Sequence, residues 1–184
     1  ATKYFSGKGD VCVGVVITRE PDEDFPTHQL PLMTIPHNLS KWRRLNGATL
    51  SPLHSWLTMK GLDTLFLRMP YVSDQALAVS QFLETQLPFV SRVLYLGLPS
   101  HPCHSVAVKK LKLTHFSGVF TFHLPISSNA AQKIIEDTDP FCAATSFGES
   151  HCLVLRPHYG SSRIFGELDS MEDDGVAGNW FRFS

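Results

Sequence analysis

The sequence predicts an α/β fold, in which helices cover a sheet. Short segments rich in β-branched and aromatic residues alternate with segments of helical period through most of the chain. Strands that alternate with helices are typical of a sheet covered by helices. The 184-residue chain is 43% hydrophobic and 18% charged, which is the composition of a globular protein with a sizeable core.

The first part of the chain predicts a strand, a loop and a helix. Residues 12–17 (CVGVVI) are an apolar, mainly β-branched run and predict a buried strand. Four prolines between residues 20 and 36 predict a loop, because proline removes backbone donors and interrupts regular elements. Ser51 followed by Pro52 predicts the start of a helix, which Gly61 interrupts.

The middle of the chain predicts the longest helix. Apolar residues at 72, 76, 79, 83 and 87 form a stripe of helical period over residues 72–87, and Pro88 ends it. A strand is predicted over residues 90–96 and a short helix over residues 102–110.

The last part of the chain predicts four short strands and one helix. Residues 118–124 (GVFTFHL) alternate with period two, which predicts a strand with one buried face. Residues 129–137 predict a helix, and the other short strands are expected at residues 142–147, 152–155 and 180–183.

Charge and composition exclude several classes of partner. The formal net charge of −1 gives no electrostatic reason to expect a nucleic-acid partner. No apolar run reaches the roughly 18 residues that a membrane span needs, so we expect no membrane partner. The histidines lack the H-E-x-x-H pattern, so we expect no metal. Cysteines without a C-x-x-C pair indicate thiols in a reducing, cytoplasmic compartment.

Ordered sequence blocks resemble one enzyme family. The chain opens with Ala-Thr-Lys-Tyr at residues 1–4, followed by Gly7 and Gly9-Asp10-Val11. Further blocks follow in order: SPL at 51–53, WL at 56–57, KGLDTL at 60–65, LRM at 67–69, GLPSHP at 97–102, GVFTF at 118–122, SFG at 146–148 and FRFS at 181–184. Together they resemble the cystathionine lyase/synthase family, the pyridoxal-phosphate enzymes of Cys/Met (trans-sulfuration) metabolism.

The resemblance implies the end of a fold-type-I, aminotransferase-like cofactor domain followed by a small C-terminal α/β domain. Residues 1–70 would be the C-terminal end of the large domain with its mostly parallel sheet, and residues 71–184 the small domain. A change of composition near residues 69–71 favours the same boundary. The family's aspartate for the pyridine nitrogen lies upstream of its lysine block, so the resemblance implies that this chain is an incomplete part of the enzyme.

The resemblance assigns the cofactor to the first residues of the chain. Lys3 matches the lysine that forms the internal aldimine with pyridoxal 5'-phosphate, and it is the expected catalytic residue. A desolvated lysine amine can act as a nucleophile and then carry a proton. Thr2 matches the residue whose hydroxyl contacts the cofactor phosphate; the alternative is a hydrogen bond to the local backbone.

Two residues match the substrate-binding positions of the family. Arg182 matches the arginine that receives the substrate α-carboxylate, since guanidinium offers parallel N–H donors. Ser146 matches a serine beside that carboxylate. The alternatives are a structural ion pair for Arg182 and a capping hydroxyl for Ser146.

Departures from the family blocks leave the reaction open. Lys8-Gly9 stand where the family usually has His-Ser, and the family's S-L-G-G is here residues 146–149, ending in Glu149. The resemblance implies a C–S lyase or transferase of sulfur amino-acid metabolism, acting on cystathionine or homoserine-ester substrates as a homodimer or tetramer. It does not separate γ-synthase, γ-lyase, β-lyase and sulfhydrylase. The alternative is a non-catalytic paralogue or C-terminal fragment that acts in binding or oligomerisation.

Overall fold

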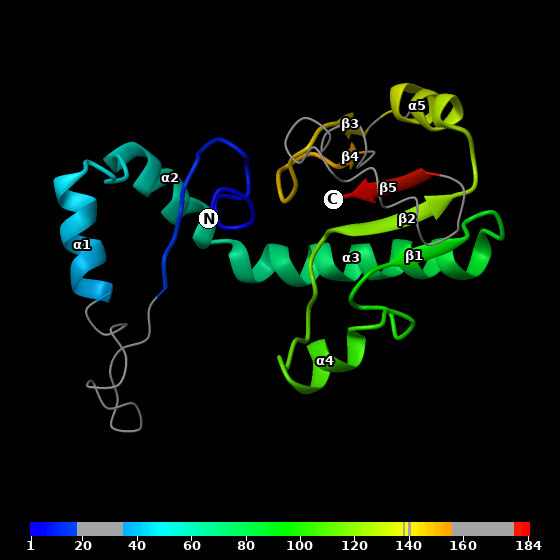
Figure 1. Cartoon of the computed structure of the whole chain (residues 1–184), viewed down its shortest axis with the longest axis horizontal. Helices are drawn as coiled ribbons and strands as arrows, with labels where there is room; N and C mark the ends of the chain where they lie inside the picture. Colours follow the sequence, from blue (N-terminus) through cyan, green and yellow to red (C-terminus); the bar gives the residue numbers. More distant parts are fainter. Residues whose placement is uncertain (18–34, 138, 140, 156–178) are drawn as a thin grey trace.

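A computed structural model describes residues 1–17, 35–137, 139, 141–155 and 179–184 of the chain (Figure 1). Helices and strands alternate from α3 to β3, and the chain combines helices with a mixed sheet, which confirms the expected α/β character. The elements are α1 (Ile35–Leu45), α2 (Pro52–Leu62), α3 (Leu65–Gln86), β1 (Arg92–Leu94), α4 (His104–Lys109), β2 (Phe120–Leu124), α5 (Ser128–Asp137), β3 (Cys142–Ala143), β4 (Leu153–Leu155) and β5 (Asn179–Phe183).

The strands form a sheet with the order β1-β2-β5-β4-β3. The pairs β1–β2, β2–β5 and β4–β5 are antiparallel, whereas β3 and β4 are parallel. The strand formed by residues 179–183 therefore lies in the centre of the sheet. Its register on β2 pairs Phe122 with Phe181 and Thr121 with Arg182.

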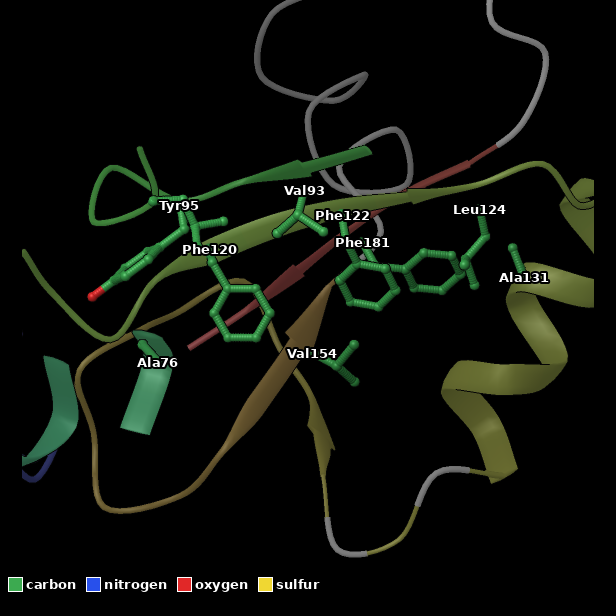
Figure 2. Close-up of a cluster of buried hydrophobic side chains, with 10 residues drawn as sticks. Ala76, Val93, Tyr95, Phe120, Phe122, Leu124, Ala131, Val154 and Phe181 are labelled. Carbon is green, nitrogen blue, oxygen red and sulfur yellow. The ribbon is translucent and has the colours of Figure 1, made fainter. Parts of the chain in front are cut away.

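Stacked aromatic rings form the centre of the core. Phe122 stacks on Phe181 with ring centroids 5.4 Å apart, and Phe120 stacks on Phe183 at 5.8 Å. Figure 2 shows Val154 of β4 beside these rings, with Ala76 of α3 and Ala131 of α5 at opposite ends of the cluster. The small alanine side chains are fully or nearly fully buried, which lets both helices approach the sheet closely.

β2 is more buried than its alternating sequence predicts. One buried face was expected, but His123 on the other face is only 1% exposed. Its imidazole lies 5.1 Å from the Trp180 ring, and its Nδ1 is hydrogen-bonded to the Ser91 hydroxyl at 2.5 Å. Trp180 and Ser91 contact His123, whereas Thr121 on the same face of the strand is partly exposed.

α3 begins earlier than predicted, and it buries at least partly four of the five positions of the predicted stripe, residues 72, 76, 83 and 87. It starts at Leu65 instead of residue 72 and contains Pro70, which lies beyond the first turn and cannot donate the helical hydrogen bond to the Phe66 carbonyl. The buried residues are Ser73, Ala76 and Ser80, whereas Val79 of the predicted stripe is 45% exposed. The expected domain boundary at residues 70–71 falls inside this helix, and the division into two domains stays a prediction.

The strand predicted at residues 12–17 is wrong. The segment contains no strand, and Val16 and Ile17 are 73% and 87% exposed. A β-branched run becomes a strand only where a neighbouring strand accepts its backbone hydrogen bonds, and here only Val13 has such bonds, to Ala1 and Thr2. The proline-rich loop at residues 20–36 lies largely outside the described residues, although helix α1 begins within its last two positions.

α1, α2 and the start of α3 present apolar side chains to solvent. Figure 1 shows α1 and α2 at one end of the molecule, away from the sheet. We call this set the apolar arm: Leu39, Trp42, Leu45, Leu53, Trp56, Met59, Phe66, Leu67 and Tyr71, all exposed.

Three smaller observations complete the description. The four cysteines are free and exposed. Within the described ranges, no helix is long and apolar enough to cross a membrane. The same ranges contain no cluster of three His, Cys, Asp or Glu side chains that could hold a metal ion.

Candidate functional site

Lys3 lies on a tight turn, which we call the lysine turn (residues 1–7). Backbone hydrogen bonds close it, from the Gly7 amide to the Lys3 carbonyl at 2.9 Å and from the Ser6 amide to the Ala1 carbonyl at 3.2 Å. The buried Ser6 hydroxyl donates to the Thr2 carbonyl at 2.6 Å. Gly7 has a φ of +73°, a conformation that glycine adopts readily. The turn therefore fixes the backbone from which the Lys3 side chain extends.

Arg68 ties the lysine turn to the helices. Its Nη2 donates to the Tyr4 carbonyl at 2.9 Å and to the Gly61 carbonyl at 2.7 Å, and its Nε donates to the Thr64 hydroxyl at 2.9 Å. One guanidinium thus links the turn with α2 and α3. Its several donors lie in one rigid plane, so it can bind three acceptors at once.

Two further residues of the turn contact distant segments. The Tyr4 hydroxyl accepts a hydrogen bond from the Gly118 amide at 3.0 Å, just before β2. A Cβ built on Gly61 would lie 2.2 Å from the Phe5 carbonyl oxygen, so α2 meets the turn backbone to backbone. The lysine turn is thereby fixed between α2 and the sheet.

The Lys3 amine reaches the other end of the sequence. Its Nζ donates to the Ser146 hydroxyl, and it lies 5.1 Å from the centroid of the Phe147 ring. Ser146 in turn donates to a carboxylate oxygen of Glu149. The side chains of Lys3, Ser146 and Glu149 are all half-buried. They form a continuous chain of hydrogen bonds.

Arg182 of β5 joins the same cluster. Its Nη2 donates to the carbonyls of Thr145 and Ser146 at 2.7 and 2.9 Å. Its Nε is buried and has no hydrogen-bond partner among the residues that the structure describes. Burial lowers the pKa of the Arg182 guanidinium from its ordinary value, but arginine starts so high that it stays charged at neutral pH. A charged group with an unused donor suits an anionic ligand.

Thr2 lies on the turn beside Lys3, but its hydroxyl is hydrogen-bonded to the local backbone. Oγ1 accepts from the Val13 amide at 2.7 Å and lies 3.3 Å from the Val13 carbonyl, to which it donates. This is the local alternative considered for Thr2. The hydroxyl keeps a second lone pair and a proton that can rotate, so its phosphate role stays a prediction.

The geometry therefore brings together three of the four expected residues, Lys3, Ser146 and Arg182. It also adds Glu149, which the sequence marked only as a departure from the family block. Tyr4 and Arg68 were inside quoted blocks without an assigned role. Their contacts with Gly118 and Gly61 are tertiary, and no local sequence pattern encodes them.

The sequence of residues 1–184 matches one family of known proteins over its whole length. The description of that family is "Cys/Met metabolism PLP-dependent enzyme". The chain belongs to this family. The membership confirms the resemblance seen in the sequence blocks, and pyridoxal phosphate is the cofactor of the family.

Relatives within the Cys/Met metabolism family carry several activities. Cystathionine gamma-synthase of Mycobacterium bovis is 37% identical over 158 residues, 85% of this chain and 36% of that protein. Cystathionine beta-lyase of Coxiella burnetii is 32% identical over 157 residues, 85% of this chain and 37% of that protein. O-succinylhomoserine sulfhydrylase of Pseudomonas aeruginosa is 34% identical over 178 residues, 97% of this chain and 39% of that protein.

A solved structure shows the same fold. Cystathionine gamma synthase from Xanthomonas oryzae pv. oryzae, in complex with aminoacrylate and cysteine, has a TM-score of 0.77 and 24% sequence identity. The similarity covers 100% of this chain and 43% of that one. This member of the Cys/Met metabolism family thus spans 36 to 39% of the length of the curated relatives it matches.

The described residues fit two parts of the family's chemistry. The half-buried Lys3 amine, on a turn fixed by Arg68, suits condensation with the cofactor aldehyde. The unused Nε donor of Arg182 suits a carboxylate.

Proposed function

We propose that this chain belongs to a pyridoxal-phosphate-dependent C–S lyase or transferase of sulfur amino-acid metabolism, with Lys3 as the residue that carries the cofactor. One observation supports the proposal most. The amine of Lys3, the hydroxyl of Ser146 and the backbone carbonyl held by Arg182 meet at one place, although they come from opposite ends of the sequence.

Lys3 would carry out two tasks. Its amine is the nucleophile for an aldehyde, and the same amine, once free, can take a proton from a neighbouring carbon and return it elsewhere. When bound, the cofactor supplies an electron sink for the charge left on that carbon. The lysine turn supports both tasks, because Arg68 and Gly118 hold Tyr4, the residue that follows Lys3.

Arg182 is the proposed anchor for the substrate α-carboxylate. The carbonyls of Thr145 and Ser146 already orient its guanidinium, so little side-chain freedom is lost when a ligand binds. The buried Nε lacks a partner among the described residues, and a carboxylate would remove that deficit. Ser146 would then lie between the amine and the carboxylate site.

Substrate class and assembly follow from family membership as proposals. We infer a small sulfur amino acid of the cystathionine or homoserine-ester type, a homo-oligomer (dimer or tetramer) and a cytoplasmic location. The relatives include a gamma-synthase, a beta-lyase and a sulfhydrylase at 32 to 37% identity, so identity does not select one reaction. Product analysis with cystathionine separates two of them, since β-cleavage yields homocysteine and γ-cleavage yields cysteine.

Borohydride trapping tests the assignment of Lys3. The full-length protein is incubated with pyridoxal phosphate, reduced and digested, and the labelled peptide is identified by mass spectrometry. We expect the label on Lys3, loss of the label in Lys3→Ala, and no loss in the control Lys8→Ala, because Lys8 is exposed. A label on another lysine, or on none, would reject the assignment.

A second candidate function is a non-catalytic paralogue that acts in binding or oligomerisation. The observation that favours it is Glu149, whose carboxylate accepts a hydrogen bond from the Ser146 hydroxyl beside Lys3. This negative charge lies where an anionic substrate would approach. If the full-length protein, supplied with pyridoxal phosphate, turns over no cystathionine or homoserine ester but still self-associates, the second candidate replaces the first.

A further inference from the structure

Glu149 lies inside the candidate site, although neither the sequence blocks nor the family gives it a role. It accepts the hydrogen bond of the Ser146 hydroxyl, and that hydroxyl accepts the hydrogen bond of the Lys3 amine. The side chain is half-buried. Only one hydroxyl therefore separates its carboxylate from the amine.

Gly9 provides the space that Glu149 needs. A Cβ built on Gly9 would lie 2.6 Å from the carboxyl carbon of Glu149 and 2.9 Å from one of its oxygens. Gly9 also has a φ of +71°, which disfavours any other residue. The family blocks have a serine at position 9 and a glycine at position 149. This chain has the smaller residue at position 9 and the larger one at position 149, and these two positions are neighbours in the structure.

The chemistry of the three groups fixes the direction of each hydrogen bond. An ionised carboxylate only accepts, so the single hydroxyl proton of Ser146 must point toward Glu149. The lone pairs of the hydroxyl then face the Lys3 amine, which only donates when protonated. Without an acceptor at position 149, the Ser146 proton can rotate, and the hydroxyl no longer presents its lone pairs to the amine continuously.

We propose that Glu149 is a positioning residue, which orients the Ser146 hydroxyl so that it anchors the Lys3 amine, and that Gly9 is the glycine that makes room for it. The importance of this anchor rests on the proposed role of Lys3. The anchor holds the free amine in place near the Phe147 ring, 5.1 Å from its centroid. A protonated amine held by this hydrogen bond must lose a proton and turn its lone pair toward a carbonyl carbon before it can attack, and the anchor limits that turning.

Competitive labelling of the lysines with a trace of acetic anhydride tests the proposal. The full-length protein, freed of cofactor, is labelled and digested, and the acetylation of Lys3 is divided by that of Lys109, which is exposed on α4. The ratio cancels differences in reagent concentration, and all variants are labelled at one pH. It also reports on the amine without requiring activity.

Three single variants and a control define the expected pattern. Glu149→Gly should raise the Lys3/Lys109 ratio about 3- to 10-fold, the range that corresponds to the loss of one hydrogen bond. Gly9→Ser should raise it in the same direction, because its Cβ displaces the carboxylate. Glu149→Gln should stay within about twofold of the original protein, since the amide oxygen still accepts. Ser150→Ala, which changes an exposed neighbour, should leave the ratio unchanged.

The double variant supplies the decisive comparison. In Gly9→Ser/Glu149→Gly the new serine has no carboxylate to displace, so the ratio should not exceed that of Glu149→Gly alone. Thermal unfolding of each variant confirms that the fold persists. An unchanged ratio in Glu149→Gly, or a Gly9→Ser effect that adds in full to it, overturns the proposal.

Failure of this proposal is distinguishable from failure of the proposed function. If pyridoxal phosphate and borohydride label Lys3 but Glu149→Gly leaves the acetylation ratio unchanged, only the role of Glu149 is rejected. If the cofactor labels a different lysine while the ratio changes as expected, the anchor exists and the proposed function is rejected.

Discussion

In the sheet, Phe122 and Phe181 stack and are 9% and 1% exposed, whereas Trp56 on α2 and Phe66 on α3 expose 55% and 74% of their surface. Both regions are rich in large apolar side chains, but only the sheet buries them within this chain. Because large exposed apolar patches usually mark interaction sites, the difference indicates that the sheet forms its own core while the apolar arm needs a surface from elsewhere.

The candidate site depends on both regions. The lysine turn is fixed by Gly61 of α2 and Arg68 of α3, and these helices also carry residues of the apolar arm. Ser146 and Arg182 belong to the sheet and its connecting loop. The comparison therefore predicts different consequences for substitutions in the two regions. Substitutions in the sheet should lower the free energy of unfolding, and substitutions in the apolar arm should weaken self-association.

The largest effect is expected in the sheet. Phe181→Ala should lower the free energy of unfolding by about 3 to 5 kcal/mol, because it leaves a cavity beside Phe122 in the central strand. Chemical denaturation measures this value. Phe89→Ala is the control, since Phe89 is 59% exposed and its loss should cost less than about 0.5 kcal/mol. Equal effects of the two substitutions would remove the distinction between core and surface.

Gly61→Ala tests how the helices hold the lysine turn. The new Cβ would meet the carbonyl oxygens of Phe5 and Ser6 at 2.2 and 2.3 Å, so backbone must move, and we expect a loss of about 1 to 3 kcal/mol in the free energy of unfolding. The Lys3/Lys109 acetylation ratio should change as well. Gly14→Ala is the matched control, because no atom lies within 4 Å of its Cβ. A stabilising effect of Gly61→Ala would contradict the contact.

Tyr95→Phe should cost about 1 kcal/mol and change the pH dependence of stability. The Tyr95 hydroxyl donates to the Ser117 carbonyl at 2.8 Å, next to Ser73. Burial raises the pKa of Tyr95 above its ordinary value, and its hydrogen bonds with Ser73 and Ser117 offset part of the effect. The unfolded state thus loses this proton at lower pH than the folded state.

The sign of the pH effect follows from that order. The stability that Tyr95 contributes is complete below about pH 10, the pKa of an unfolded tyrosine, and it is lost as the pH rises through the folded pKa. Denaturation curves between pH 8 and pH 11 should show a steeper decline for the original protein than for Tyr95→Phe. Parallel declines would show that the phenol titrates normally.

The smallest effect on stability is expected in the apolar arm. Trp56→Ser and Phe66→Ser should change the free energy of unfolding by less than about 0.5 kcal/mol in the dissociated chain, since both side chains are exposed. Sedimentation at decreasing concentration should instead show weaker self-association. A loss of several kcal/mol without any change in association would mean that the arm has its own core.

The sequence predicted the elements of the sheet region well, because their signals are local. Alternation at residues 118–124 and the aromatic run at 180–183 correspond to β2 and β5, within two residues at each end. The failure at residues 12–17 has a physical reason, since β-branched residues favour strands only when a partner strand is present. Helix α1 was missed although Trp42 and Leu45 have helical spacing and Arg43 and Arg44 stand in its last turn.

The candidate site was predicted only where it matched the family blocks. Lys3, Ser146 and Arg182 come together as those blocks imply. Glu149 was visible only as a mismatch, because its role depends on the distant Gly9 and Ser146. The hydrogen bonds of Thr2 with Val13 likewise depend on the path of the chain after the turn, which composition and periodicity do not determine.

The central position of β5 has a consequence for biosynthesis. The ribosome makes β2 and β4 before residues 179–183, yet these strands are joined only through β5. At roughly 5 to 20 residues per second, the phenylalanines of β2 wait several seconds for their stacking partners. A nascent chain paused in this interval would expose the apolar side chains and unpaired edges of an incomplete sheet, which favour aggregation. Translation speed and chaperone supply would therefore govern the yield of folded protein.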